Sequence, residues 1–132
     1  MLKSILILLV ISINQNISCQ SVRDNAIELL ESVTKKFQIN DLDGALSDID
    51  KSIKLDSTYY AAYYNKGLIE LKQEKYNEAF LRADKTLKIN PEMIEAYALR
   101  SFLYNHFANY GKAISDCTAA LSINRYSQYI LF

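Results

Sequence analysis

Ser57–Pro91 has the sequence STYYAAYYNKGLIELKQEKYNEAFLRADKTLKINP, and this stretch decides the fold. Its apolar residues recur at helical spacing on both sides of a polar turn around Gln73–Lys75, which predicts two short amphipathic helices. The chain repeats the pattern once before this stretch and once after it, at a constant interval and without an insertion. Such a regular period indicates an array of equivalent supersecondary units, not one irregular globule.

The period appears at positions that carry the same kind of residue in every copy. These positions are Ala45, Ala79 and Ala113; Leu42, Tyr76 and Tyr110; Ile53, Leu87 and Leu121; and Leu55, Ile89 and Ile123. Antiparallel helices approach closely only where side chains are small, and Gly67 and Ala83 meet that need in the central copy. A glycine inside a helix costs about 1 kcal/mol relative to alanine, so we expect a packing reason for Gly67.

The central copy resembles a tetratricopeptide repeat, a helix–turn–helix unit whose length matches the period of this chain. With Tyr60 as its first residue, it has aromatic, small and proline residues where this family prefers them. These residues are Tyr63, Gly67, Tyr76, Ala79, Ala83 and Pro91. The resemblance implies an all-α fold, a right-handed α-solenoid of three helix–turn–helix repeats. The repeats would cover residues 26–59, 60–93 and 94–127, followed by a C-terminal tail at 128–132.

Polar residues at the predicted helix boundaries are candidates for caps. Asp24 or Asn25 is expected to cap the first helix of the array, and Asp41 the second. Asn90 is expected to cap the first helix of the third repeat, with Pro91 at its first helical position.

The end of the chain departs from the repeat pattern. Cys117 occupies the small core position that Ala83 holds one unit earlier, and we expect it to be a buried hydrophobe. Arg125 replaces the closing proline, and an apolar tail follows. Three outcomes stay open for the tail. A fold-back of one turn over Leu121 and Ile123 is favoured over a docking site for a partner and over a fourth helix that has been truncated.

Residues 1–19 have the three-part layout of a secretory signal peptide. Lys3 gives a basic start, an apolar run covers residues 5–13, and a polar segment at 14–18 precedes Cys19. The apolar run has about half the length that a membrane-spanning helix needs. A buried N-terminal helix is the alternative, but nothing else in the chain offers a face for it. We therefore expect export, to a periplasmic or membrane-anchored extracytoplasmic location.

Two processing outcomes stay open at Cys19. With Ser18 before it, Cys19 resembles the lipid-modified cysteine of bacterial lipoproteins, which implies anchoring at a membrane surface. Asn16 departs from that family's motif, which prefers leucine at this position. Ordinary signal cleavage near Cys19–Gln20 is the other outcome.

The composition argues against several classes of function. Lys and Arg total 15, and Asp and Glu total 15, with the signs interspersed, so the chain lacks the basic face of a nucleic-acid binder. The acidic side chains are expected on solvent-exposed faces. His106 has no Cys, Asp or Glu three or four residues away to complete a metal pair, and no base is placed to activate Cys117. We therefore predict no catalysis, no metal site and no cofactor.

In the resembled family, the first helices of the repeats line a concave groove that holds an extended peptide or a partner helix. Carried over to this sequence, the resemblance places residues from all three repeats in the groove. They are Leu30, Thr34 and Phe37 of the first repeat, Tyr64, Asn65, Leu68 and Leu71 of the second, and Ala98, Phe102, Asn105 and His106 of the third. Packing between neighbouring repeats is the alternative role for some of them, Leu71 above all.

A chaperone-binding subgroup of this family grips a C-terminal carboxylate with Lys, Asn and Arg side chains at set positions. This chain matches that set only at Asn65. Leu30 and Thr34 stand at the first-repeat positions, and Glu95 and Leu99 at the third-repeat positions. We therefore do not expect a carboxylate clamp.

Together, these features predict an exported, non-catalytic protein–protein interaction module that acts as a scaffold or assembly factor. The alternative is a self-associating structural repeat. Its contacts would be the ends of the array and the C-terminal tail, including Ile130 and Leu131.

Overall fold

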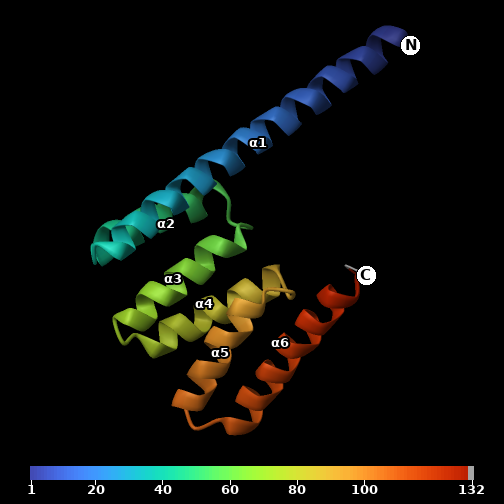
Figure 1. Ribbon diagram of the computed structural model, residues 1–132. Coiled ribbons are helices and arrows are strands. Elements are labelled where there is room, and N and C mark those ends of the chain that lie inside the picture. The colour runs from blue at the N-terminus through green and yellow to red at the C-terminus, as the bar shows by residue number, and fades with distance from the viewer. Residues whose placement is uncertain (131–132) are drawn as a thin grey trace. The chain divides into compact units, whose positions relative to one another are not determined.

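A computed structural model describes the backbone of residues 1–130 and the side chains of residues 1–125. The described residues form six helices joined by short turns, and no strand occurs among them. The helices are α1 (Leu2–Gln38), α2 (Leu42–Leu55), α3 (Tyr60–Lys72), α4 (Tyr76–Ile89), α5 (Ile94–His106) and α6 (Tyr110–Ile130) (Figure 1). The chain divides into two compact units: unit 1, Met1–Ser57, holds α1 and α2, and unit 2, Thr58–Phe132, holds α3 to α6.

The helix boundaries follow the period of the sequence. Helices α2, α4 and α6 begin at Leu42, Tyr76 and Tyr110, which are equivalent positions of successive repeats. Helices α1, α3 and α5 end at Gln38, Lys72 and His106, which are again equivalent positions. The predicted turn around Gln73–Lys75 is confirmed, because α3 ends at Lys72 and α4 begins at Tyr76.

Each helix–turn–helix hairpin turns through one residue in the left-handed conformation. Asn40, Glu74 and Ala108 have φ angles of 63°, 60° and 56°. In each turn the next N–H donates to a carbonyl five residues back, for example from Asp41 to Lys36 at 2.9 Å. This is the long hydrogen bond of the Schellman motif, which usually has glycine at the left-handed position. None of these three left-handed residues is a glycine, so the sequence gives no glycine signal for the geometry of the turns.

In unit 1, α2 packs along the C-terminal half of α1. Ala26 and Val33 of α1 and Ala45 and Ile49 of α2 are buried. The buried Ser52 hydroxyl donates to the carbonyl oxygen of Ala26 at 3.1 Å and so links the two helices.

The predicted start of the first repeat helix at Asp24 or Asn25 is wrong. Both residues lie inside α1, which runs without a break from Leu2 to Gln38 and whose N-terminal half continues beyond α2 (Figure 1). No glycine or proline precedes Gly44, so nothing in the sequence interrupts this helix. Residues 1–21 are exposed throughout.

The predicted cap of α2 is confirmed. The Asp41 carboxylate accepts a hydrogen bond from the N–H of Gly44 at 3.0 Å. The same carboxylate lies where a β-carbon on residue 44 would sit, which explains the glycine.

In unit 2, α3 and α4 form one hairpin, α5 and α6 form the next, and α4 packs on α5. Gly67 lies where α3 approaches α4 and α5 closely, as its sequence position predicts. A β-carbon on residue 67 would lie 3.1 Å from Cβ of Arg82 in α4 and 3.3 Å from Cδ2 of Leu99 in α5. The three helices can pack this closely because glycine has no side chain at this position.

The predicted start of α5 at Pro91 is wrong. Pro91 and Glu92 form a turn, and the helix begins at Ile94 with Met93 as its N-cap. The Asn90 side chain instead accepts a hydrogen bond from the N–H of Glu92 at 3.2 Å, an Asx-type turn that carries the chain out of α4.

Two predictions for the last repeat are also wrong. Helix α6 continues to Ile130, so the tail does not fold back over Leu121 and Ile123 in the described backbone. Cys117 is exposed and not buried. Its equivalent Ala83 is buried because α5 covers α4, whereas in the described residues α6 packs on α5 alone.

Candidate functional site

The candidate groove residues of unit 2 lie on α3 and α5, the first helices of its two hairpins. We call these eight residues the α3–α5 face: Tyr64, Asn65, Leu68 and Leu71 of α3, and Ala98, Phe102, Asn105 and His106 of α5. The four residues of α5 are exposed, and Phe102 has an exposed fraction of 54%. An apolar ring this exposed on a helix face is a candidate contact site.

Three of the four residues of α3 have a second role in packing. Leu68 and Leu71 are half-buried against the core cluster of Ala79, Ala83, Leu99 and Leu103, together with Tyr64. Their side chains therefore support the hairpin interface, in line with the alternative role expected for Leu71. Asn65 donates from Nδ2 to the carbonyl oxygen of Ala61 at 2.8 Å, within its own helix.

The hydroxyl of Tyr64 lies near a carboxylate of the neighbouring repeat. Burial, and then the negative charge of Glu95 at the start of α5, raises the pKa of Tyr64. The phenol therefore stays protonated at neutral pH and is available as a hydrogen-bond donor beside the face.

Aromatic rings join α4 to α5 at the far end of the face. The ring of Tyr76 stacks on the imidazole of His106, with centroids 3.8 Å apart and an interplanar angle of 23°. Phe80 meets the ring of Tyr104 edge-on, with centroids 5.0 Å apart. Tyr76 thus covers one side of the His106 ring. A partner on the α3–α5 face could contact only the other side and the edge of this ring.

In unit 1, the three candidate residues differ in exposure. Leu30 is buried, Phe37 is half-buried and Thr34 is exposed. The Thr34 hydroxyl donates to the carbonyl oxygen of Leu30 at 3.1 Å.

An ion pair between a buried carboxylate and a half-buried basic side chain links the two helices of each of the first two hairpins. Lys36 of α1 pairs with Asp48 of α2, and Glu70 of α3 pairs with Arg82 of α4 at 3.3 Å. The residue pairs 36/48 and 70/82 are separated by one repeat, so the two hairpins carry the same bridge with opposite signs. Asp48 and Glu70 are each only 6% exposed, so the prediction that acidic side chains lie on solvent faces is wrong here.

The environment of Asp48 favours its charged form. Hydrogen bonds from the Lys36 ammonium and from the Ser32 hydroxyl at 2.8 Å lower the pKa of Asp48 from 3.8 to about 2. The carboxylate therefore stays ionised across the physiological range.

In the third hairpin, Tyr104 stands at the position of Lys36 and Glu70, and Arg100, one turn earlier on α5, makes the link to Asp116 instead. Its Nε and one terminal nitrogen each donate to Asp116 of α6 at 2.8 Å, and the other terminal nitrogen donates to Asp84 of α4 at 2.9 Å. The bidentate contact with Asp116 raises the pKa of Arg100 above its usual range. Hydrogen bonding from Lys88, with the charge of Arg100 nearby, lowers the pKa of Asp84. Arg100 thus joins three helices of unit 2.

Sequence reasoning missed these bridges although a signal was present. In the first repeat the positions 36 and 48 are Lys and Asp, and one period later they are Glu and Arg. A compensated change of sign at two positions with the same spacing indicates contact between them.

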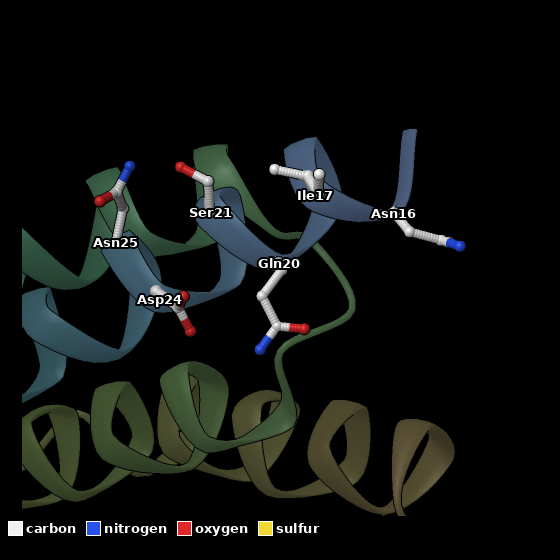
Figure 2. A pocket seen from close by; sticks show the side chains of 6 residues that line it. All are labelled: Asn16, Ile17, Gln20, Ser21, Asp24 and Asn25. Atoms are coloured by element: carbon white, nitrogen blue, oxygen red, sulfur yellow. The ribbon is translucent and has the colours of Figure 1, made fainter. Parts of the chain in front are cut away.

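The remaining features offer little for chemistry. Among the described residues, no group of three or more His, Cys, Asp or Glu side chains could hold a metal ion. A hollow of about 430 Å³ lies against α1 at Asn16, Ile17, Gln20, Ser21, Asp24 and Asn25. Figure 2 shows that Gln20 and Asp24 leave one side of the helix, whereas Ser21 and Asn25 leave the other. These polar groups do not converge on one point, as a small-molecule site requires.

Comparison with known proteins identifies the fold. No family model matches the sequence, and no curated protein matches it. Solved structures do match. A crystal structure of MamA is 22% identical with a TM-score of 0.75, over 81% of this chain and 63% of that chain. This chain thus spans less than two thirds of the MamA structure.

Two further matches are tetratricopeptide repeat domains in complexes. The second such domain of Spaghetti (RPAP3), bound to an HSP90 peptide, is 19% identical with a TM-score of 0.73, over 79% of this chain and 96% of that chain. The TPR2B domain of yeast Sti1, in complex with pHsp70, is 19% identical with a TM-score of 0.73, over 80% and 84% of the two chains. The likeness shows that this chain has the tetratricopeptide repeat fold, so the predicted all-α repeat class is confirmed.

Proposed function

We propose that the chain is a non-catalytic binding module that holds a peptide or a partner helix on the α3–α5 face, as a scaffold or assembly factor. The observation that carries the proposal is the exposed ring of Phe102 on α5. Half-buried Tyr64 and Leu68 lie on the neighbouring first helix, so an apolar side chain of a partner would find aromatic and aliphatic contacts there. Both tetratricopeptide repeat domains of Spaghetti (RPAP3) are known with an HSP90 peptide bound, which supports a peptide as the ligand class.

The partner proposed for this chain is not a C-terminal chaperone tail. Of the side chains that grip a terminal carboxylate in the chaperone-binding subgroup, this chain has only Asn65, and the residue at one third-repeat position, Leu99, is buried in the core. The face instead offers Phe102 with the neutral polar groups of Asn105 and Tyr64. This combination suits an internal peptide segment with an apolar anchor residue.

We also propose that the chain is exported and held at a membrane surface. Within the described residues, α1 is the one helix that is long and apolar enough to cross a bilayer, a property that N-terminal signal sequences share. Cys19 is exposed on α1, as lipid attachment would require. Metabolic labelling with a radioactive fatty acid tests the lipid. Label on the wild type and none on Cys19→Ala supports it, and an unlabelled wild type contradicts it.

The binding proposal is tested by capture from native membranes and soluble extract. The wild type is compared with Phe102→Asp and with Leu81→Asp, a matched control because Leu81 is 60% exposed on α4, away from the face. Leu68→Asp is avoided, because Leu68 packs on the core cluster and its loss would unfold the hairpin interface. A protein retained by the wild type and by Leu81→Asp, but lost by Phe102→Asp, is the expected result. Equal capture by all three contradicts the proposal.

Self-association is the second candidate function, and one observation favours it. The outer surface of α6 carries exposed Ile114 and Leu121. Among the tail residues first considered for this contact, the side chain of Ile130 and all of Leu131 lie outside the described part of the chain.

A further inference from the structure

One charged residue continues the row of α5 side chains on the α3–α5 face. Glu95 precedes Phe102 by seven residues, which is almost two helical turns, so the two side chains leave α5 in nearly the same direction. Ala98, Phe102 and Asn105 follow Glu95 at the three- and four-residue spacing of one helix face. All four residues are exposed. Glu95 therefore extends the face toward the N-terminal end of α5.

The effect of Glu95 on Tyr64 places its carboxylate on the side of α5 that faces α3. Burial raises the pKa of Tyr64, and the negative charge of Glu95 raises it further. Tyr64 belongs to α3 and packs on the core cluster that α4 and α5 share. Because a Coulomb interaction weakens with distance, the carboxylate lies near Tyr64 and not on the far side of α5.

The charge of Glu95 is not balanced on this face. No ion pair engages Glu95 within the part of the chain whose side chains the structure describes. Arg100 is the one basic residue between Glu95 and Phe102, and its guanidinium binds carboxylates of α4 and α6 instead. Lys72, the last residue of α3, lies more than two turns along that helix from Tyr64. The surface between Glu95 and Phe102 thus combines an apolar ring with a negative charge.

A role in helix stability does not account for the placement of Glu95. An acidic residue in the first turn of a helix is stabilised by the helix dipole, and both Glu78 of α4 and Glu95 of α5 occupy such positions. The dipole favours an acidic residue on any side of the first turn. Glu95, however, lies on the side of Phe102 and Tyr64, where a ligand on the α3–α5 face would meet it.

We propose that the α3–α5 face selects an extended peptide segment that carries a Lys or Arg side chain near its apolar anchor, with the anchor on Phe102 and the cation at Glu95. This inference rests on the binding function proposed above and adds the charge of the ligand. The rise of α5 between Glu95 and Phe102 is about 10 Å. An extended chain advances roughly 3.4 Å per residue, so about two to four residues bridge this length once the reach of the basic side chain is included.

The test is selection from a random library of short peptides displayed on phage, with the full-length chain in a mild non-ionic detergent as the target. The wild type is compared with Phe102→Ala, which removes the ring without adding a charge, and with Glu95→Lys. Glu78→Lys is the matched control, because Glu78 is also an exposed acidic residue in the first turn of a helix.

We expect the wild type and Glu78→Lys to enrich peptides with a basic residue about two to four positions from an aromatic or aliphatic one. Phe102→Ala should lose these peptides, and Glu95→Lys should enrich peptides with an acidic residue in place of the basic one. Fluorescence anisotropy then compares one enriched peptide with its variant in which the basic residue is Glu. On the wild type this variant should bind roughly 10-fold more weakly, because like charges replace an exposed ion pair, and the difference should shrink as salt is added.

The outcomes separate this inference from the binding function on which it rests. Peptides that depend on Phe102 but show no preference for a basic residue, or keep the same preference with Glu95→Lys, overturn the inference and leave the binding face in place. Enrichment that Phe102→Ala does not change, or no enrichment by any of the targets, overturns the proposed binding face and this inference with it.

Discussion

At the scale of single residues, Gly67 sets the spacing of three helices. Replacing it with alanine would gain roughly 1 kcal/mol of helix propensity. However, the new methyl group would lie 3.1 Å from Cβ of Arg82, which is fixed to the backbone of α4 and cannot rotate away. We expect Gly67→Ala to lower the free energy of unfolding by about 1–2 kcal/mol, within the usual cost of overpacking.

Gly111 is the control for this substitution. It lies in α6, and a β-carbon there would meet nothing within 4 Å. Gly111→Ala should therefore raise the free energy of unfolding by up to about 1 kcal/mol. Urea titrations followed by circular dichroism measure both. Equal effects of the two substitutions would contradict the close approach at Gly67.

Asp48 makes the stability of unit 1 depend on pH in a defined direction. Its pKa in the folded protein is about 2, against an ordinary value of 3.8. A carboxyl group whose pKa is depressed by folding stabilises the protein above its unfolded pKa, and this contribution is lost as pH falls through the folded value. We expect the stability advantage of wild type over Asp48→Asn to shrink by about 1–2 kcal/mol between pH 5 and pH 2.

Denaturant titrations at several pH values measure this change, with Asp24→Asn, an exposed carboxylate on α1, as the control. A difference between wild type and Asp48→Asn that stays constant over the whole pH range would show that Lys36 and Ser32 do not hold Asp48 in its charged form.

At the scale of helices and turns, the two bridges with opposite signs make a reversal experiment possible. Glu70→Lys should destabilise unit 2 by roughly 2–3 kcal/mol, because it places a second positive charge against Arg82 at a buried position of α3. Adding Arg82→Asp should restore most of that loss, because Lys36 and Asp48 show that the hairpin accepts the reversed order. A double-mutant cycle on thermal unfolding measures the coupling. An absence of rescue would mean that the two sites are not equivalent.

The sequence predicted these elements unevenly, for physical reasons. The sequence predicted the N-cap of α2 at Asp41 and the turn between α3 and α4, because the polar turn and capping residues there interrupt the apolar spacing. It did not predict the left-handed turns at Glu74 and Ala108, since neither residue favours that conformation by itself. The predicted N-cap at Asn25 is wrong because a capping residue acts only at a helix terminus, and α1 continues through Asn25 without a break.

At the scale of the molecule, the repeat was enough to predict the fold. Which side chains are exposed for binding could not be predicted without knowing how the helices pack. The α3–α5 face mixes residues that serve the core, such as Leu68, with residues free to contact a partner, such as Phe102. Spacing alone cannot separate the two, because both sets recur at the same helical interval. The exposure of Cys117 likewise depends on whether a further helix covers α6, which the position of one residue in a repeat does not encode.

The most direct test of the central claim, that the α3–α5 face holds a peptide or partner helix, is site-specific photo-crosslinking. A photoreactive phenylalanine analogue replaces Phe102 in one protein and Leu81, on the solvent face of α4, in another. The account predicts a discrete crosslinked species from position 102 and none from position 81. No adduct from position 102, or the same adduct from both positions, would contradict it.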